Sequence, residues 1–288
     1  MILDILKSKK VCLSCEVSPP KALTSLKDSK EIVGEISKLN PAYISVTCGA
    51  GGNQAVTDKT IEVAKQIENS GAVSLAHITC INASDESLNS MLDSLSANGV
   101  KNVLALRGDL PDGYTINEDA KYKHASDLVK MIKEKGGFTV GGACYPEGHI
   151  ESKNREADIE NLKIKVANGC DFLTTQMFFD NNILYSFMFR LLKNGIDIPV
   201  TAGIMPVVNA KQIERITSLS GTKLPPRFAS IVDRFGDNPK SMRQAGIAYA
   251  TEQIIDLISN GVNNIHLYTM NKPDIAESII SNLSDIVN

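Results

Sequence analysis

The sequence predicts a (β/α)8 TIM barrel, in which eight parallel strands form a closed barrel surrounded by helices. Short β-branched runs alternate with longer amphipathic runs, and eight strand-like runs can be counted. Six helical runs also end in Gly or Asn-Gly before the next strand, as at Asn98-Gly99 and Asn260-Gly261. An open doubly wound sheet is the alternative, but no G-x-G-x-x-G follows the first strand. We therefore expect residues 1–288 to form a single barrel domain, since such barrels have about 250 residues.

The expected elements follow one another in strict alternation. The strands are Cys12–Val17, Tyr43–Thr47, Val73–Ile78, Asn102–Leu106, Thr139–Cys144, Phe172–Thr175, Pro199–Gly203 and Asn264–Leu267. The helices are Ser25–Leu39, Thr57–Asn69, Asp85–Ala97, Ala125–Glu134, Asn154–Ala167, Asn181–Lys193, Ala210–Leu219, Met242–Ser259 and Pro273–Leu283. Segment Ser220–Lys240 is too long for a tight loop, so it predicts extra short helices before the last strand.

Composition and charge exclude several classes of protein. Apolar residues make up 43% of the chain, which indicates a globular protein. The net charge of -3, without a basic run, argues against binding to nucleic acid or an anionic membrane. No apolar stretch approaches the roughly 18 residues of a membrane span, and no signal peptide is evident, so we expect a cytoplasmic protein.

The six cysteines are expected to be reduced core residues. Cys12 and Cys15 form a C-x-x-C, but they lie on an extended segment, where residues three apart point to opposite faces. This spacing argues against a redox pair or a metal site, and we expect no bound metal.

Polar residues gather where the expected strands end. In a barrel these ends form one rim, which carries the active site. Each residue has a structural explanation when taken alone. His77 could be a satisfied core histidine, Arg107 and Asp109 a simple ion pair, and the Asp158–Lys165 face a solvated helix surface. Their convergence favours a catalytic rim, to which we assign Glu16, Thr47, His77, Thr79, Arg107, Asp109, Tyr145, Glu147, His149, Gln176, Tyr268 and Thr269.

Eight motifs, in order along nearly the whole chain, carry a family resemblance. They are Cys15-Glu16-Val17-Ser18-Pro19-Pro20, Ser45-Val46-Thr47-Cys48-Gly49-Ala50, Ala76-His77-Ile78-Thr79-Cys80, Ala105-Leu106-Arg107-Gly108-Asp109-Leu110-Pro111, Tyr145-Pro146-Glu147-Gly148-His149, Thr175-Gln176-Met177-Phe178-Phe179-Asp180, Gly203-Ile204-Met205-Pro206-Val207 and His266-Leu267-Tyr268-Thr269-Met270-Asn271. With these motifs the chain resembles the bacterial methylenetetrahydrofolate reductases. The resemblance implies the catalytic barrel alone, without a regulatory domain.

The resemblance also implies FAD as cofactor, with catalytic roles for Glu16 and Asp109. The residues implied to contact FAD are Thr47, Cys48, His77, Arg107, Gly108, Asp109, His124, Ala125, Tyr145, His149, Asp158, Asn161 and Lys165. Those implied to contact substrate are Glu16, Asp109, Gln176, Gln212 and Lys272. The chain departs from the family at Ile164, in place of a basic flavin contact, and at Ile216, near an aromatic that stacks on substrate in some members.

The implied reaction reduces 5,10-methylenetetrahydrofolate to 5-methyltetrahydrofolate with NADH or NADPH. Glu16, flanked by apolar residues, would protonate the leaving nitrogen as the folate ring opens, because a poorly solvated carboxylic acid can donate near neutral pH. Asp109 would stabilise the resulting cation. Two alternatives stay open: another flavin barrel, such as a proline-dehydrogenase-like enzyme, or a folate-reducing subunit whose electron donor is a partner protein. We expect a homo-oligomer.

Overall fold

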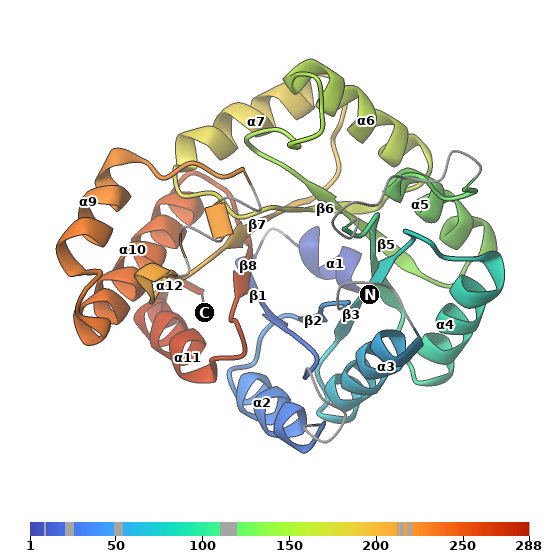
Figure 1. The fold of residues 1–288 in the computed structure, drawn as a ribbon, viewed down its shortest axis with the longest axis horizontal. Coiled ribbons are helices and arrows are strands. Elements are labelled where there is room, and N and C mark those ends of the chain that lie inside the picture. Colours follow the sequence, from blue (N-terminus) through green and yellow to red (C-terminus); the bar gives the residue numbers. More distant parts are fainter. Residues whose placement is uncertain are drawn as a thin grey trace.

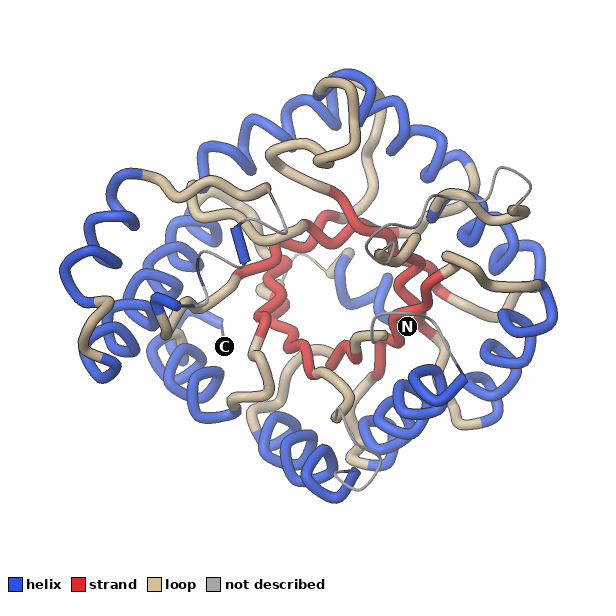
Figure 2. The backbone as a smooth tube through the Cα atoms, in the orientation of Figure 1, coloured by secondary structure: helices blue, strands red, loops and turns tan. Residues whose placement is uncertain are grey.

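A closed barrel of eight parallel strands forms the centre of the molecule (Figures 1 and 2). The computed structural model describes residues 1–8, 10–20, 26–48, 54–109, 120–211, 213, 216–217 and 221–287. The strands, in barrel order, are β1 (Cys12–Val17), β2 (Ile44–Val46), β3 (Ser74–Thr79), β4 (Asn102–Leu106), β5 (Thr139–Cys144), β6 (Phe172–Thr175), β7 (Val200–Ile204) and β8 (Asn264–Tyr268). The predicted fold class is confirmed, and each strand lies within about a residue or two of its expected position.

Helices surround the barrel on the outside (Figure 2). Those between strands are α2 (Leu26–Lys38), α3 (Gln54–Asn69), α4 (Asp85–Ala97), α5 (Ala125–Lys135), α6 (Arg155–Ala167), α7 (Asn181–Lys193), α9 (Pro226–Phe235) and α10 (Pro239–Ser259), and those at the two ends of the chain are α1 (Ile2–Leu6), α11 (Pro273–Asn282) and α12 (Ser284–Val287). The predicted extra helix before the last strand is α9. Among the described residues, no helix is both long enough and apolar enough to cross a lipid bilayer.

The helix expected at Ala210–Leu219 falls partly outside the described residues. Within it, residues 210, 211, 213, 216 and 217 are described and helical. The predicted helix-stop glycines all have positive φ, between 74° and 103°, which is the conformation that ends a helix without strain only for glycine.

Successive side chains of each strand point to opposite faces of the sheet, so the barrel has two separate buried regions. Residues on the outer side, such as Cys15, pack between the barrel and its helices. Residues on the inner side, such as Cys12, pack inside the barrel. The two cysteines of the C-x-x-C therefore point to opposite sides of β1, as predicted, and both are free thiols.

The short helix α1, which the sequence did not predict, closes the bottom of the barrel. Its Ile2 and Leu6 are buried against inward-facing residues, and the Ile2 N–H donates to Oδ1 of Asn102 on β4, at 3.1 Å. The apolar cluster at this end contains Ile2, Leu6, Cys12, Tyr43, Leu75, Leu104 and Phe172. With one end filled in this way, only the opposite end of the barrel interior is left for a binding site.

Helix α10 approaches the segment after β7 very closely. A Cβ atom placed on Gly246 would lie 1.9 Å from the carbonyl oxygen of Val207, so glycine is required at this contact. By contrast, a Cβ atom on Gly34, in α2, would meet nothing within 4 Å.

We expect Gly246→Ala to destabilise the protein, because the added methyl group would push α10 away from the barrel. Overpacking of this kind costs about 1–3 kcal/mol. The matched control, Gly34→Ala, should be neutral or stabilising by up to about 1 kcal/mol, because alanine favours helix and has room there. Urea unfolding of both variants measures the difference; equal effects would contradict the close contact.

Candidate active site

A large cavity opens at the carboxyl ends of β2 to β5. Its volume is about 600 Å³, which is within the usual range for ligand and cofactor sites. The predicted flavin contacts that line it are Cys48, Arg107, Gly108, Asp109, His124, Ala125, Tyr145, His149, Asp158, Asn161 and Lys165. Four strand ends and two helices thus bring together residues that are distant in the sequence.

Backbone groups form one wall of this cavity. Gly108 has a φ of 92°, and a Cβ atom on it would lie 2.8 Å from Cγ2 of Ile81, so the chain can make this turn only with glycine. The first turn of α5 also contributes to the lining, through Ala125, Ser126 and Asp127. The free N–H groups at the start of a helix favour a negatively charged group such as a phosphate.

An ion pair lies on the wall of the same cavity. Both terminal nitrogens of Arg107 donate to the carboxylate of Glu151, one of them at 2.7 Å, and Nε of Arg107 donates to the carbonyl of Gly108. The hydrogen bond to Glu151 raises the pKa of Arg107, and the same bond lowers the pKa of Glu151. Arg107 is therefore fixed in position on the cavity wall. Glu151 was not predicted as a site residue.

Lys165 is a buried, hydrogen-bonded cation and not a solvated one. Its Nζ donates to the carbonyl of Ala143 at 2.6 Å, and burial lowers its pKa. Asp158, about two helical turns earlier in α6, is buried and accepts a hydrogen bond from Ser152 at 3.1 Å. Asp158 and Lys165 are therefore not part of the solvated helix surface that the sequence alone would allow, whereas Asn161 on the same face is exposed.

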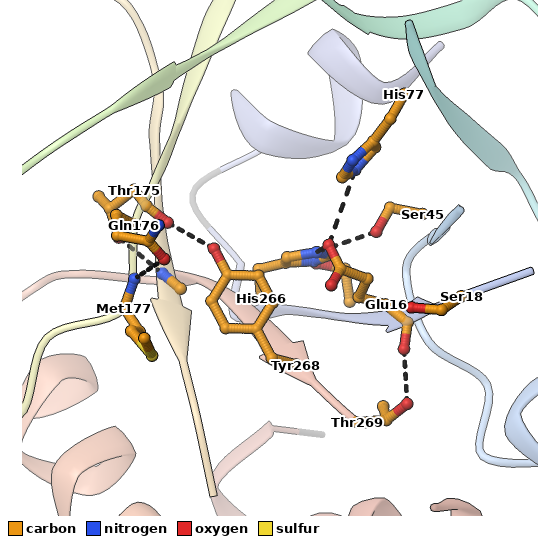
Figure 3. A network of polar contacts seen from close by, with 12 residues as sticks. Glu16, Ser18, Ser45, His77, Thr175, Gln176, Met177, His266, Tyr268 and Thr269 are labelled. Carbon is orange, nitrogen blue, oxygen red and sulfur yellow. Dashed lines mark hydrogen bonds and ion pairs between the residues drawn. The ribbon is translucent and has the colours of Figure 1, made fainter. Parts of the chain in front are cut away.

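A smaller cavity of about 270 Å³ lies inside the barrel beside the first. Leu106, Ala143 and Tyr145 line both cavities, so the two adjoin. Glu16, His77, Gln176, His266 and Tyr268 also line the smaller one (Figure 3). The predicted acid and the predicted flavin-binding cavity are therefore neighbours.

Two histidine rings face one oxygen of Glu16. Nε2 of His77 lies 3.7 Å from Oε2 of Glu16, and Nε2 of His266 lies 3.9 Å from the same oxygen (Figure 3). His266 is also bonded to two serines, Ser14 at 2.7 Å through Nδ1 and Ser45 at 3.0 Å through Nε2. Nε2 of His77 is buried and has no hydrogen-bond partner among the described residues. Burial lowers the pKa of His77 to about 4, although the nearby Glu16 opposes this shift.

Tyr268 braces the far wall of the smaller cavity. Its hydroxyl donates to the carbonyl of Thr175 at 2.6 Å, crossing over β7 (Figure 3). This crossing needs Gly203, where a Cβ atom would lie 2.5 Å from the Tyr268 hydroxyl. Next to Thr175, Oε1 of Gln176 accepts a hydrogen bond from the N–H of Met177, which fixes the orientation of its amide.

The remaining predicted site residues lie elsewhere. Thr47 follows β2 but lines neither cavity, and Lys272 caps α11, outside both. Gln212 lies outside the described residues. Ile164 lines the large cavity and is 54% exposed, whereas Ile216 packs against an apolar cluster that includes Phe179.

His266 and Glu151 are the residues of the site that sequence reasoning missed. His266 could have been found, because it precedes Tyr268 by two positions and must share its inward face of β8. Nothing in the sequence marks Glu151 as the partner of Arg107, which is 44 residues away.

Comparison with known proteins identifies the family. A family model described as methylenetetrahydrofolate reductase matches residues 1–284. The chain belongs to the methylenetetrahydrofolate reductase family. It is 33% identical to the 5,10-methylenetetrahydrofolate reductase of Escherichia coli (strain K12), over 94% of this chain and 90% of that protein. It is also 33% identical to the Zea mays methylenetetrahydrofolate reductase (NADH) 1, over 98% of this chain but only 50% of the plant protein. As a member of this family, the chain is an enzyme.

Solved structures share the fold of this reductase-family chain at low sequence identity. One is described as an uncharacterized protein from Clostridium thermocellum that binds two copies of 5-methyl-5,6,7,8-tetrahydrofolic acid; its TM-score is 0.69 at 15% identity, covering 99% of this chain and 98% of that chain. Another is the dihydropteroate synthase of Xanthomonas albilineans, with a TM-score of 0.54 at 12% identity, covering 98% and 94%.

We expect His77 to make stability depend on pH between about 6.5 and 4. The unfolded chain binds a proton at this histidine near pH 6.5, whereas the folded protein resists protonation until about pH 4. The folded protein should therefore lose up to about 3 kcal/mol as the pH falls through this window.

Urea unfolding at several pH values should show this loss in the wild type and a smaller loss in His77→Gln. The control is His124→Gln, which changes an exposed histidine and should follow the wild-type curve. Parallel curves for wild type and His77→Gln would contradict the buried, neutral state of His77.

Proposed function

We propose that the protein catalyses the FAD-dependent reduction of 5,10-methylenetetrahydrofolate to 5-methyltetrahydrofolate, with NADH or NADPH as electron donor. The observation that carries the proposal is the position of Glu16. This carboxylate lies in a cavity that adjoins a cofactor-sized cavity, on a chain that belongs to the reductase family. The 5-methyltetrahydrofolate bound by the Clostridium thermocellum protein of the same fold supports a reduced folate as the ligand class.

The large cavity fits FAD in volume and in the chemistry of its walls. Arg107, held in position by Glu151, would place its guanidinium group against the cofactor, and the N–H groups of Ala125 and Ser126 at the start of α5 would face the pyrophosphate. The turn at Gly108 leaves the backbone bare where a side chain would intrude. When bound, FAD would take hydride from the nicotinamide and deliver it to the folate.

Glu16 would act as the general acid that opens the folate ring. The side chain is only 16% exposed, and two histidine nitrogens face its Oε2, so bulk water does not compete for the carboxyl group. It would transfer its proton to the leaving nitrogen, which produces the iminium cation that accepts hydride. General acid catalysis of this kind is typically worth about 10²–10⁴-fold in rate.

The other chain groups would orient the folate and balance its charge. Asp109 lies at the exposed rim of the large cavity, where its carboxylate would attract the cationic form of the folate. The Oε1 atom of Gln176 is already bonded to the Met177 N–H, so the amide nitrogen is left to donate to the substrate. Gln212 and Lys272 are proposed to contact the substrate by resemblance alone.

We expect the purified protein to be yellow, with FAD absorbance that co-elutes with the chain. Gly108→Ala should lower the FAD content at least severalfold, because the methyl group would collide with Ile81 and displace the cavity wall. The control is Gly99→Ala, which has a similar positive φ of 87° but nothing within 4 Å of its Cβ position. Equal FAD content in the two variants, measured by absorbance after gel filtration, would contradict the assignment of the cavity.

We expect Glu16→Gln to abolish folate reduction, by about 100-fold or more, because an amide cannot supply the proton. Flavin reduction by NADH or NADPH should change little. Anaerobic stopped-flow measurement of the two half-reactions separates these effects. The control is Glu147→Gln, a half-buried carboxylate that lines neither cavity. Loss of both half-reactions together, or of neither, would show that Glu16 is not the acid.

A further inference from the structure

The wall of the large cavity carries more acidic than basic side chains. Among its described lining residues, the carboxylates are Asp109, Asp127, Glu151 and Asp158, and the lysine and arginine side chains are Lys165 and Arg107. Carboxylates therefore outnumber these cations by two to one. The pyrophosphate of a bound cofactor would add further negative charge in a partly enclosed space, where like charges repel more strongly than in water.

Three of the four carboxylates already have a fixed place. Asp158 is buried and accepts a hydrogen bond from a serine hydroxyl at 3.1 Å. Asp127 accepts hydrogen bonds from two backbone N–H groups just before α5, both at 2.9 Å. Asp109 is exposed to solvent at the rim. The fourth, Glu151, lies directly against the arginine.

The side chain of Glu151 can leave the cavity wall without any movement of its loop. Among the described residues, its carboxylate forms hydrogen bonds only with Arg107, and the side chain is 53% exposed. The backbone is held separately, because the N–H of Glu151 donates to Nδ1 of His149 at 3.1 Å and the N–H of Ser152 donates to the carbonyl of His149 at 2.9 Å. Rotation about the side-chain bonds alone would therefore carry the carboxylate into solvent.

Arg107 can exchange its partner and still stay on the wall. Its Nε donates to the carbonyl of Gly108 at 3.2 Å, and this bond does not involve Glu151. Both terminal nitrogens donate to the two oxygens of Glu151. Phosphate oxygens accept the same paired hydrogen bonds from a guanidinium group as a carboxylate does. Glu151 thus offers Arg107 the same type of partner that a phosphate group would.

We infer that Glu151 competes with the pyrophosphate of FAD for Arg107, and thereby limits how tightly the chain holds its cofactor. The inference rests on the proposed function, because it requires FAD as the ligand of the large cavity. An arginine paired with a carboxylate attracts an anion weakly, whereas one released from it presents its full charge. Displacement of Glu151 also removes one of the repelling carboxylates from the wall.

Equilibrium dialysis of the full-length protein against a series of FAD concentrations tests the inference. Glu151→Gln keeps the size of the side chain and removes its charge, so the dissociation constant for FAD should fall roughly three- to tenfold, as expected when a partly exposed ion pair no longer has to be broken. The matched control is Glu160→Gln. Glu160 is exposed and paired with Lys163 at 2.9 Å, but it does not line the cavity, so this variant should bind FAD like the wild type.

Unfolding in urea gives a second readout that separates competition from a purely structural role. Glu151→Gln should be less stable than the wild type without FAD, because the ion pair is lost, and equally stable at saturating FAD, because the wild type has then also given up the pair. A residue that only supports the fold would destabilise the protein to the same extent under both conditions, and that result would overturn the inference.

The same substitution in the Arg107→Gln background shows whether Glu151 acts through the arginine. Glu151→Gln should then change FAD binding less than twofold, because the group for which it competes is absent. Binding by Glu151→Gln that is no tighter than that of the wild type, or an equal gain in the Arg107→Gln background, would overturn the inference and leave the proposed function intact. A wild type that binds no FAD at all would overturn the proposed function, and this inference with it.

Discussion

Pairing between β1 and β8 closes the barrel, and the position of every group in the smaller cavity depends on it. The register sets Ser14 beside His266 and Glu16 beside Tyr268. Side chains that follow β8 add further bonds to β1 and the residues after it. Thr269 donates to the carbonyl of Glu16 at 2.5 Å, and the Asn271 side chain accepts from the N–H of Ser18 and donates to its carbonyl. A shift of one residue would turn Glu16 to the outside, because neighbouring residues on a strand face opposite ways.

The interior of the barrel changes character along its axis. At the bottom it is apolar and filled by α1, whereas the middle carries buried polar side chains, including Ser14, Ser45 and His266. Branched apolar residues usually occupy such layers. Burying polar groups costs free energy unless they are hydrogen-bonded, and the bonds from His266 to both serines offset that cost. Nε2 of His77 has no such partner in the described part of the chain, and burial lowers the pKa of this histidine to about 4.

Much of the fold and part of the site could be predicted from the sequence. Short β-branched runs located the strands, and the glycines that follow six of the helical runs located the helix ends, because both are local signals. The rim was predictable from Glu16, Arg107 and Tyr145, since each follows or ends a strand and parallel strands bring their ends together. Helix α1 was missed because five residues are too few to show a helical period. The Arg107–Glu151 pair was missed because it depends on how two loops approach in space. The buried state of Lys165 was missed because α6 has almost no apolar face to indicate its orientation.

Helix α1 also separates the barrel interior from solvent at the bottom of the barrel. Ile2 and Leu6 seal the floor on which Tyr43 lies, and the ring of Tyr43 in turn stacks on His266, with centroids 5.7 Å apart. Without Ile2 and Leu6, water would reach Tyr43 from the bottom of the barrel, and His266 would lose part of its burial. The first six residues of the chain thus help to bury His266, which is only 1% exposed and lies near the other end of the sequence.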